Sequence, residues 1–300
     1  MNWLSIGVAC TSTELEALES LFWNTGAVSV TVIDAEDNPI FEPGPGEIPL
    51  WDDVTATGLY EDDIDPELVK VKMKEAGFDV KFVDALGDRV WEREWLVRFK
   101  PMQFGKRLWV CPTGHEVKAE NAVVMDLDPG LAFGTGTHAT TQMCLEWLDG
   151  HVKPGMRVLD FGSGSGILGI AALLLGAESV LAIDNDVQAL RASMDNAIRN
   201  NVQDKLLTSL PELMPKVMLD KIPADESQFD LVIANILAQP LIDLSDKLSG
   251  YMKADGHLVL SGIMLAQSDW VKEAYALSFI EEKTSDGWVC LHARSANVAE

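Results

Sequence analysis

Three alternating glycines follow an apolar run and an acidic residue near the middle of this 300-residue chain. Residues 158–166 read Val-Leu-Asp-Phe-Gly-Ser-Gly-Ser-Gly, and Asp184, 22 residues after Gly162, closes a second apolar run. The glycines permit positive φ and let a ligand approach the backbone, because no Cβ intrudes. An acid at the end of the next strand can accept hydrogen bonds from both hydroxyls of a ribose. The pattern predicts a nucleotide-type cofactor at the carboxyl end of a parallel sheet.

The glycines alone do not choose the cofactor, because residues 164–169 also match the dinucleotide pattern G-x-G-x-x-G. Asp160 lies two positions before Gly162, where a carboxylate would repel a pyrophosphate but suit the ammonium of a methionyl group. A later apolar run, 229–234, ends at Asn235, where amine-directed methyltransferases hold the acceptor nitrogen. Both details favour S-adenosylmethionine over NAD and make Asn235 the candidate catalytic residue. Candidate cofactor-binding residues are Asp160, Gly162, Gly164, Asp184 and Asn235.

The composition is strongly acidic, with 23 Lys and Arg against 47 Asp and Glu and a formal net charge of −24. A phosphate backbone would be repelled at long range, so direct nucleic-acid binding is not expected. A basic partner would be attracted, although acidity can equally serve solubility. The length and the 47% hydrophobic content suffice for two domains, each with its own core.

The four cysteines, at positions 10, 111, 144 and 290, form no C-x-x-C pair. Neither a zinc site nor a redox motif is indicated, and no metal is expected. The N-terminal residues lack a basic segment, and no apolar run approaches the roughly 18 residues of a membrane span. We therefore expect reduced thiols, no membrane association and a cytoplasmic location.

Residues 1–100 repeat one pattern of strand, helix and strand. The predicted strands are 3–10, 27–33, 54–60 and 78–83, and the predicted helices are 13–23 and 66–76. Thr13 to Glu16 has the spacing of a capping box, and Asp65-Pro66 suits the start of the second helix. Gly26 and Gly77 are the predicted helix stops. Two such units in succession predict an α+β ferredoxin-like domain, whose role would be oligomerisation, stability or docking of a macromolecular substrate.

Large apolar side chains are frequent between the two parts of the chain: Trp91, Trp95, Phe99, Phe104 and Trp109. Such residues normally seal a core or a domain junction. We treat 101–128 as a connecting segment between the first domain and a second domain at 129–300.

A loop of small and hydroxyl residues, 128–141, leads into a helix expected at 142–148. Its many donors and small side chains suggest a loop folded over a ligand that faces the helix N-terminus, with Thr137 as a candidate cofactor contact. His138 has the chemistry of a general base. A lone histidine in a loop is more often a capping or packing residue, and both roles stay open.

From Met156 to about Phe279, apolar runs and helical patterns alternate, and 281–294 has the pattern of a hairpin turned at 285–287. This order predicts a doubly wound, Rossmann-like α/β domain with an antiparallel edge.

Four blocks spread over the chain have a specific joint order. They are 104–109 with Cys111-Pro112, 127–138 with Thr140-Thr141, 160–166, and 235–238. With them the chain resembles the bacterial ribosomal protein L11 methyltransferases, which are class I S-adenosylmethionine-dependent protein methyltransferases. The resemblance implies cofactor contacts at Thr141, Gly162, Asp184 and Asn235. It also implies an N-terminal domain that captures the basic ribosomal protein and presents its α-amine and lysine ε-amines to one active site.

The chain departs from that family's pattern in small ways. Ser163 stands where cysteine is common, Ala139 stands where proline often follows the histidine, and the segment at 206–228 is longer. We treat the longer segment as a surface insertion. The alternatives are a methyltransferase acting on another protein or on a small amine, and a non-enzymatic module that retains the cofactor.

Overall fold

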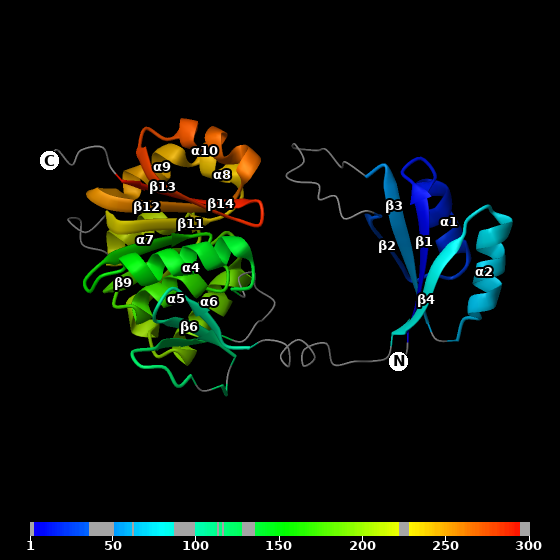
Figure 1. Ribbon diagram of the computed structural model, residues 1–300, viewed down its shortest axis with the longest axis horizontal. Coiled ribbons are helices and arrows are strands. Elements are labelled where there is room, and N and C mark those ends of the chain that lie inside the picture. The colour runs from blue at the N-terminus through cyan, green and yellow to red at the C-terminus, as the bar shows by residue number, and fades with distance from the viewer. Residues whose placement is uncertain are drawn as a thin grey trace. The chain divides into compact units, whose positions relative to one another are not determined.

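The computed structural model describes residues 3–35, 51–61, 63–86, 100–112, 114–115, 117–127, 136–221 and 228–294. The chain divides into two compact units, Met1–Glu94 and Trp95–Glu300 (Figure 1).

The N-terminal unit is a four-stranded antiparallel sheet in the order β2-β3-β1-β4, with its helices packed on one face. Its elements are β1 (Trp3–Thr11), α1 (Leu15–Asn24), β2 (Ser29–Asp34), β3 (Asp53–Glu61), α2 (Pro66–Glu75) and β4 (Val80–Leu86). Alternate strand residues such as Ile6 and Val8 share a core with Phe22 of α1 and Met73 of α2. This strand order confirms the predicted ferredoxin-like arrangement.

The two helices of this unit begin differently. Asp65 caps α2 as predicted, because its carboxylate accepts a hydrogen bond from the backbone amide of Glu67 at 3.0 Å. The capping box predicted from Thr13 is wrong, since α1 begins at Leu15 and its N-cap residue, Glu14, makes no capping bond. The Glu14 carboxylate turns back instead to the amide and hydroxyl of Thr11, at 3.0 and 2.8 Å. These donors at the end of β1 compete successfully for the side chain.

The C-terminal unit is built on a seven-stranded sheet in the order β10-β9-β8-β11-β12-β14-β13. Its strands are β8 (Arg157–Phe161), β9 (Ser179–Ile183), β10 (Leu206–Ser209), β11 (Phe229–Asn235), β12 (Met252–Met264), β13 (Ser278–Ser285) and β14 (Trp288–Arg294). The first five in sheet order are parallel, and β14 and β13 add an antiparallel edge. Asp286 and Gly287, with φ of +50° and +79°, form the hairpin turn. The predicted doubly wound fold is confirmed.

Helices cover both faces of this sheet (Figure 1). They are α4 (Ala139–His151), α5 (Ile167–Leu174), α6 (Val187–Arg199), α7 (Met214–Lys221), α8 (Ala238–Asp243), α9 (Ser245–Tyr251) and α10 (Ser268–Ala274), with 3-10 turns at Gln203–Lys205 and Leu265–Gln267. Alternation along each strand divides the apolar residues between the faces, so Val158 packs with α4 and α5 while Leu159 packs against α8. The continuous apolar runs of the sequence follow from this burial on both sides.

A second sheet, which precedes α4 in the chain, has three strands in the order β5-β6-β7. Its strands are β5 (Met102–Phe104), β6 (Leu108–Cys111) and β7 (Val123–Asp126). Phe104, Leu108 and Met125 lie in the same core as α4 and α5, and the Asp149 carboxylate of α4 accepts the amide of Lys106 at 2.6 Å. The segment that we treated as a connector thus packs as part of the C-terminal unit. Trp91, Trp95 and Phe99 lie outside the described residues.

The prediction that 206–228 is a surface insertion is wrong for its described part. Leu206 pairs with Val180, which makes β10 the edge strand of the main sheet. Met214 of α7 is buried in the core on one face of that sheet. Leu206 and Met214 are apolar and buried, so this part of the segment belongs to the core of the C-terminal unit.

Candidate active site

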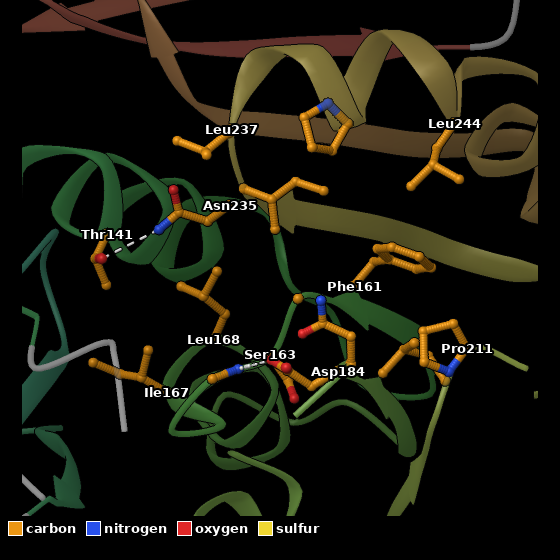
Figure 2. Close-up of a pocket in the computed structure, with 16 residues that line it drawn as sticks. Thr141, Phe161, Ser163, Ile167, Leu168, Asp184, Pro211, Asn235, Leu237 and Leu244 are labelled. Atoms are coloured by element: carbon orange, nitrogen blue, oxygen red, sulfur yellow. Dashed lines mark hydrogen bonds between the residues drawn. The ribbon is translucent and has the colours of Figure 1, made fainter. Parts of the chain in front are cut away.

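A cavity of about 460 Å³ lies at the carboxyl ends of β8, β9 and β11 (Figure 2). Ligands of open α/β sheets bind at this edge, and the volume lies in the range of small-molecule sites. Apolar side chains make up much of its wall, among them Phe161, Ile183, Pro211 and Leu244. Five of the predicted site residues line it: Thr141, Gly162, Gly164, Asp184 and Asn235.

The glycine loop runs along the cavity with its backbone exposed to a ligand. Gly162, Gly164 and Gly166 have φ of +79°, +54° and +78°, so each occupies the region that disfavours other residues. The amide of Gly164 donates to Oδ2 of Asp184 at 2.8 Å. The hydroxyl of Ser193, on α6, holds the other side of the loop by donating to the Gly164 carbonyl at 2.9 Å.

Asp184 follows β9 and is half-buried at the cavity wall. Its second oxygen, Oδ1, accepts the backbone amide of Asp186 at 2.9 Å. Two backbone donors therefore fix the carboxylate. Each oxygen keeps capacity for a further hydrogen bond, as binding of two ribose hydroxyls requires.

Asn235, at the end of β11, meets Thr141 of α4 at the wall of the cavity (Figure 2). Its amide nitrogen donates to the Thr141 hydroxyl at 3.2 Å, although the two residues are 94 positions apart in sequence. This bond engages one of the two N–H groups of the carboxamide and leaves its oxygen available as an acceptor.

The chain is similar to known proteins both in sequence and in structure. A family model described as ribosomal protein L11 methyltransferase matches residues 2–296. The chain belongs to this family. It is 47% identical to the ribosomal protein L11 methyltransferase of Pseudomonas putida strain GB-1 over 98% of this chain and 99% of that protein. The Vibrio cholerae relative of the same name is 48% identical over 92% of each chain.

A solved structure agrees with this assignment. The crystal structure of ribosomal protein L11 methylase from Lactobacillus delbrueckii subsp. bulgaricus is 30% identical, with a TM-score of 0.57. The match covers 66% of this chain and all of that one.

Asp160 is placed differently from the five predicted residues that line the cavity of this L11 methyltransferase family member. It does not line the cavity, because its side chain points to the face of the sheet covered by α5 and is fully buried. Oδ2 accepts the amide of Gly169 at 2.9 Å, and Oδ1 has no hydrogen-bond partner among the described residues. Burial raises the pKa of Asp160 to about 7, with a smaller contribution from the charge of Asp184, against the bond from Gly169. Asp160 thus anchors α5 to β8.

This buried carboxyl predicts a pH dependence of stability. The pKa of Asp160 is about 7 in the folded protein against 3.8 as its ordinary value, so stability falls as pH rises between these values. We expect the free energy of unfolding of Asp160→Asn, measured with urea, to increase relative to that of the parent by up to about 1 kcal/mol per pH unit from pH 5 to 7. The exposed Asp255→Asn should give curves parallel to the parent. A constant difference for Asp160→Asn would mean that Asp160 is ionised throughout.

Two predicted residues of the loop before α4 lie away from the cavity. The exposed Thr137 does not line it, and its carbonyl accepts the side-chain amide of Gln142 at 2.9 Å. His138 is the N-cap of α4: its Nδ1 accepts the amide of Thr140 at 3.4 Å and lies 2.8 Å from the Thr140 hydroxyl. Its ring also packs edge-on against Trp288. Capping and packing are the roles seen for His138, and residues 128–135 lie outside the described part.

Several residues that sequence reasoning missed complete the cavity wall. Ile236 and Leu237 directly follow Asn235, and Leu237 presents a 53% exposed side chain at the rim. Pro211 comes from the segment that we had treated as an insertion. The apolar residues directly after Asn235 could have been predicted to line the cavity from their position at the strand end. Pro211 could be placed there only once the pairing of β10 with β9 was known.

The described residues hold no group of three or more His, Cys, Asp or Glu that could bind a metal ion. All four cysteines are buried and free. Among the helices of the described ranges, none is both long enough and apolar enough to cross a membrane.

Proposed function

We propose that this protein transfers methyl groups from S-adenosylmethionine to the α-amine and lysine ε-amines of ribosomal protein L11. Family membership supports the substrate and the reaction. The observation that carries the site is the Asn235–Thr141 pair, which offers a neutral carboxamide oxygen beside the glycine loop and Asp184.

The cavity fits the cofactor in size and in chemistry. Asp184 would accept the ribose hydroxyls, and the backbone of the glycine loop at Gly162 and Gly164 would pass along the methionyl part. Pro211 and Leu244 supply apolar surface for a purine ring. When bound, S-adenosylmethionine supplies a methyl group activated by its positively charged sulfur.

The acceptor amine must be neutral to attack. For a lysine of pKa about 10.4, deprotonation at pH 7 costs about 4.6 kcal/mol, whereas for an α-amine of pKa about 7.8 it costs only about 1 kcal/mol. The Asn235 oxygen can accept an N–H of the neutral amine and aim its lone pair. A carboxylate in the same place would also stabilise the unreactive ammonium. We therefore expect the α-amine to be the easier acceptor.

No general acid is needed, because the leaving sulfur becomes neutral as it departs. Asp160 is buried against α5 and His138 caps α4, so we assign neither residue a step in the reaction. Alignment of nitrogen, methyl and sulfur then supplies most of the rate.

The N-terminal unit is proposed to recognise the ribosomal protein. We expect a fragment of residues 95–300 to bind S-adenosylmethionine like the full chain but to methylate intact L11 at least about tenfold more slowly, because tethered docking raises the local concentration of acceptor amines. A short peptide with a free α-amine should be methylated equally by both. Steady-state kinetics with both substrates makes the comparison, and full activity of the fragment on intact L11 would assign recognition to the C-terminal unit.

Steady-state kinetics with L11 at rising salt concentration tests whether the acidic charge attracts the basic substrate. If the net charge of −24 steers the basic substrate, the KM for L11 should rise as the Debye length falls from about 10 Å at 0.1 M to about 3 Å at 1 M. A flat salt profile would leave the acidity as a solubility trait. The same repulsion of phosphate argues against direct RNA binding, and a cytoplasmic location follows from the proposed substrate.

Labelled S-adenosylmethionine tests the function against its alternatives. Incubation with L11, with other ribosomal proteins and with small amines should place label on L11 alone. Label on another protein or a small amine would change the substrate. Cofactor binding with no transfer would leave a non-enzymatic module.

A further inference from the structure

The turn after β11 packs against a glycine on each of two sides, Gly162 and Gly262. The side chain of Ile236 packs against Gly162, where an added Cβ would overlap its Cγ2 methyl. The backbone of Ile236 lies against Gly262 of β12. A Cβ on Gly262 would lie 2.8 Å from the Ile236 carbonyl carbon, 3.1 Å from its amide nitrogen and closer still to its carbonyl oxygen. Real Cβ atoms essentially never come within 3.0 Å of such atoms, so a larger residue at 262 must move the turn.

Gly262 lies at an irregularity in β12. The pairing of β12 with β14 shifts register between Leu260 and Ile263. On the opposite edge, Ser261 still pairs with Asn235 of β11. Gly262 has φ of +84°, which strains any other residue. Bulges of this kind often re-aim side chains next to active sites.

The same bulge also contacts α4. The buried hydroxyl of Ser261 lies 3.3 Å from the carbonyl oxygen of Thr140 and 3.3 Å from that of Val289 on β14, so its one proton is shared between the two acceptors. Thr140 precedes Thr141, and Ile236 follows Asn235. Two adjacent residues of β12 therefore touch the chain neighbours of both members of the hydrogen-bonded pair, but neither touches the cavity.

We propose that the Ser261–Gly262 bulge sets the geometry of the Asn235–Thr141 pair and that Gly262 is a positioning residue for methyl transfer. Gly262 acts through the backbone of Ile236, which fixes the direction in which the Asn235 side chain leaves β11. The inference rests on the proposed function, because it assumes that Asn235 orients the acceptor amine.

Gly262→Ala tests the proposal in the full-length protein. The added methyl must displace the backbone of Ile236, and a shift of about 1 Å in an aligned site can cost about a hundredfold in rate. We expect single-turnover methyl transfer to L11 to slow by about that factor, while the Kd for S-adenosylmethionine changes less than about threefold, since alignment acts mainly on the transition state.

Gly287→Ala is the matched control. Gly287 has a similar φ, +79°, but an added Cβ there would meet nothing within 4 Å. Both variants place an alanine at a positive φ, and only one pushes on Ile236. Gly287→Ala should keep the parental transfer rate. Equal rates in the two variants would overturn the proposal.

A double variant shows whether Gly262 acts through Asn235. If it does, Gly262→Ala should slow the Asn235→Ala protein little further, whereas independent effects would multiply. A multiplied loss overturns the proposal. Where Gly262→Ala fails to fold, Ser261→Ala adds no atoms and should still slow transfer at unchanged cofactor affinity. A parental rate in Ser261→Ala overturns the role of the bulge.

Methylation of L11 by the parent tests the proposed function, whereas the crystal structure of Gly262→Ala tests the positioning role separately. If the parent methylates no L11, the proposed function is wrong. The crystal structure of Gly262→Ala still tests the positioning role, because the distance from Asn235 Nδ2 to Thr141 Oγ1 should then exceed the present 3.2 Å. An unchanged pair would overturn it.

Discussion

Asn235→Ala is expected to slow methyl transfer by about a hundredfold or more, because the acceptor amine loses the group that aims its lone pair. Cofactor affinity should fall far less, since the lost contact is expressed chiefly in the transition state. Single-turnover rates with L11, together with calorimetric titration of S-adenosylmethionine, measure the two effects separately.

Asn235→Asp tests the mechanism more sharply. A carboxylate keeps an oxygen acceptor but stabilises the ammonium form of the amine, which raises the pKa of the acceptor. The rate at pH 7 should therefore drop and recover in part as pH rises. The recovery should be more visible for lysine than for an α-amine, because lysine has more to gain from deprotonation.

His138→Ala is the control for both variants. It removes the cap of α4 and should cost about 1 kcal/mol of stability without a pH-dependent loss of rate. The opposite pattern would reassign the roles. If Asn235→Asp matches the parent while His138→Ala is inactive despite normal cofactor binding, His138 is the base and Asn235 does not orient the amine.

Asp184→Ala should weaken binding of S-adenosylmethionine at least about tenfold, because charge-assisted bonds to the ribose hydroxyls are lost. The structure adds a second reason. The Gly164 amide loses its acceptor, so the glycine loop must be ordered again when the cofactor binds. Calorimetry gives the affinity directly. Unchanged affinity would show that Asp184 does not bind the ribose. Preferential binding of NAD would show that the protein is not a methyltransferase.

Asp186→Ala controls for general damage near this acid. Asp186 caps α6 through its side chain, which accepts the amide of Gln188 at 2.8 Å, whereas its contact with Asp184 is made by its backbone. The substitution should therefore lower stability but leave cofactor affinity close to the parental value. A loss as large as that of Asp184→Ala would point to the turn as a whole and away from the ribose.

The doubly wound sheet could be predicted because its apolar runs, glycine turns and acids are local in sequence. The glycine loop and Asp184 come from one βαβ unit, so their meeting at the ends of adjacent strands follows from connectivity alone. Thr141 is different. Nothing local shows that α4 crosses to the end of β11, and only the resemblance to the family indicated it.

Other errors arose where one residue has two possible partners. Asp160 stands beside the glycine loop in sequence, but alternation along β8 sends its side chain toward Gly169 of α5 and not into the cavity. Glu14 likewise turns to Thr11 and not to its helix. Such choices depend on which donors the packed structure leaves free, which sequence spacing does not reveal.

The bond from Asn235 to Thr141 also bears on how many times one nitrogen can react. One N–H of the Asn235 amide is engaged by Thr141, and in the proposed role the carboxamide oxygen accepts a hydrogen bond from the substrate amine. A neutral primary amine brings two N–H groups, a monomethylated amine brings one, and a dimethylated amine brings none. If Asn235 orients the amine as proposed, the first two transfers keep the hydrogen bond to its oxygen. The third transfer lacks that bond and relies on the apolar wall near Ile236 and Leu237. Each added methyl removes one N–H that can donate to Asn235. We therefore expect the third transfer at any amine to be the slowest.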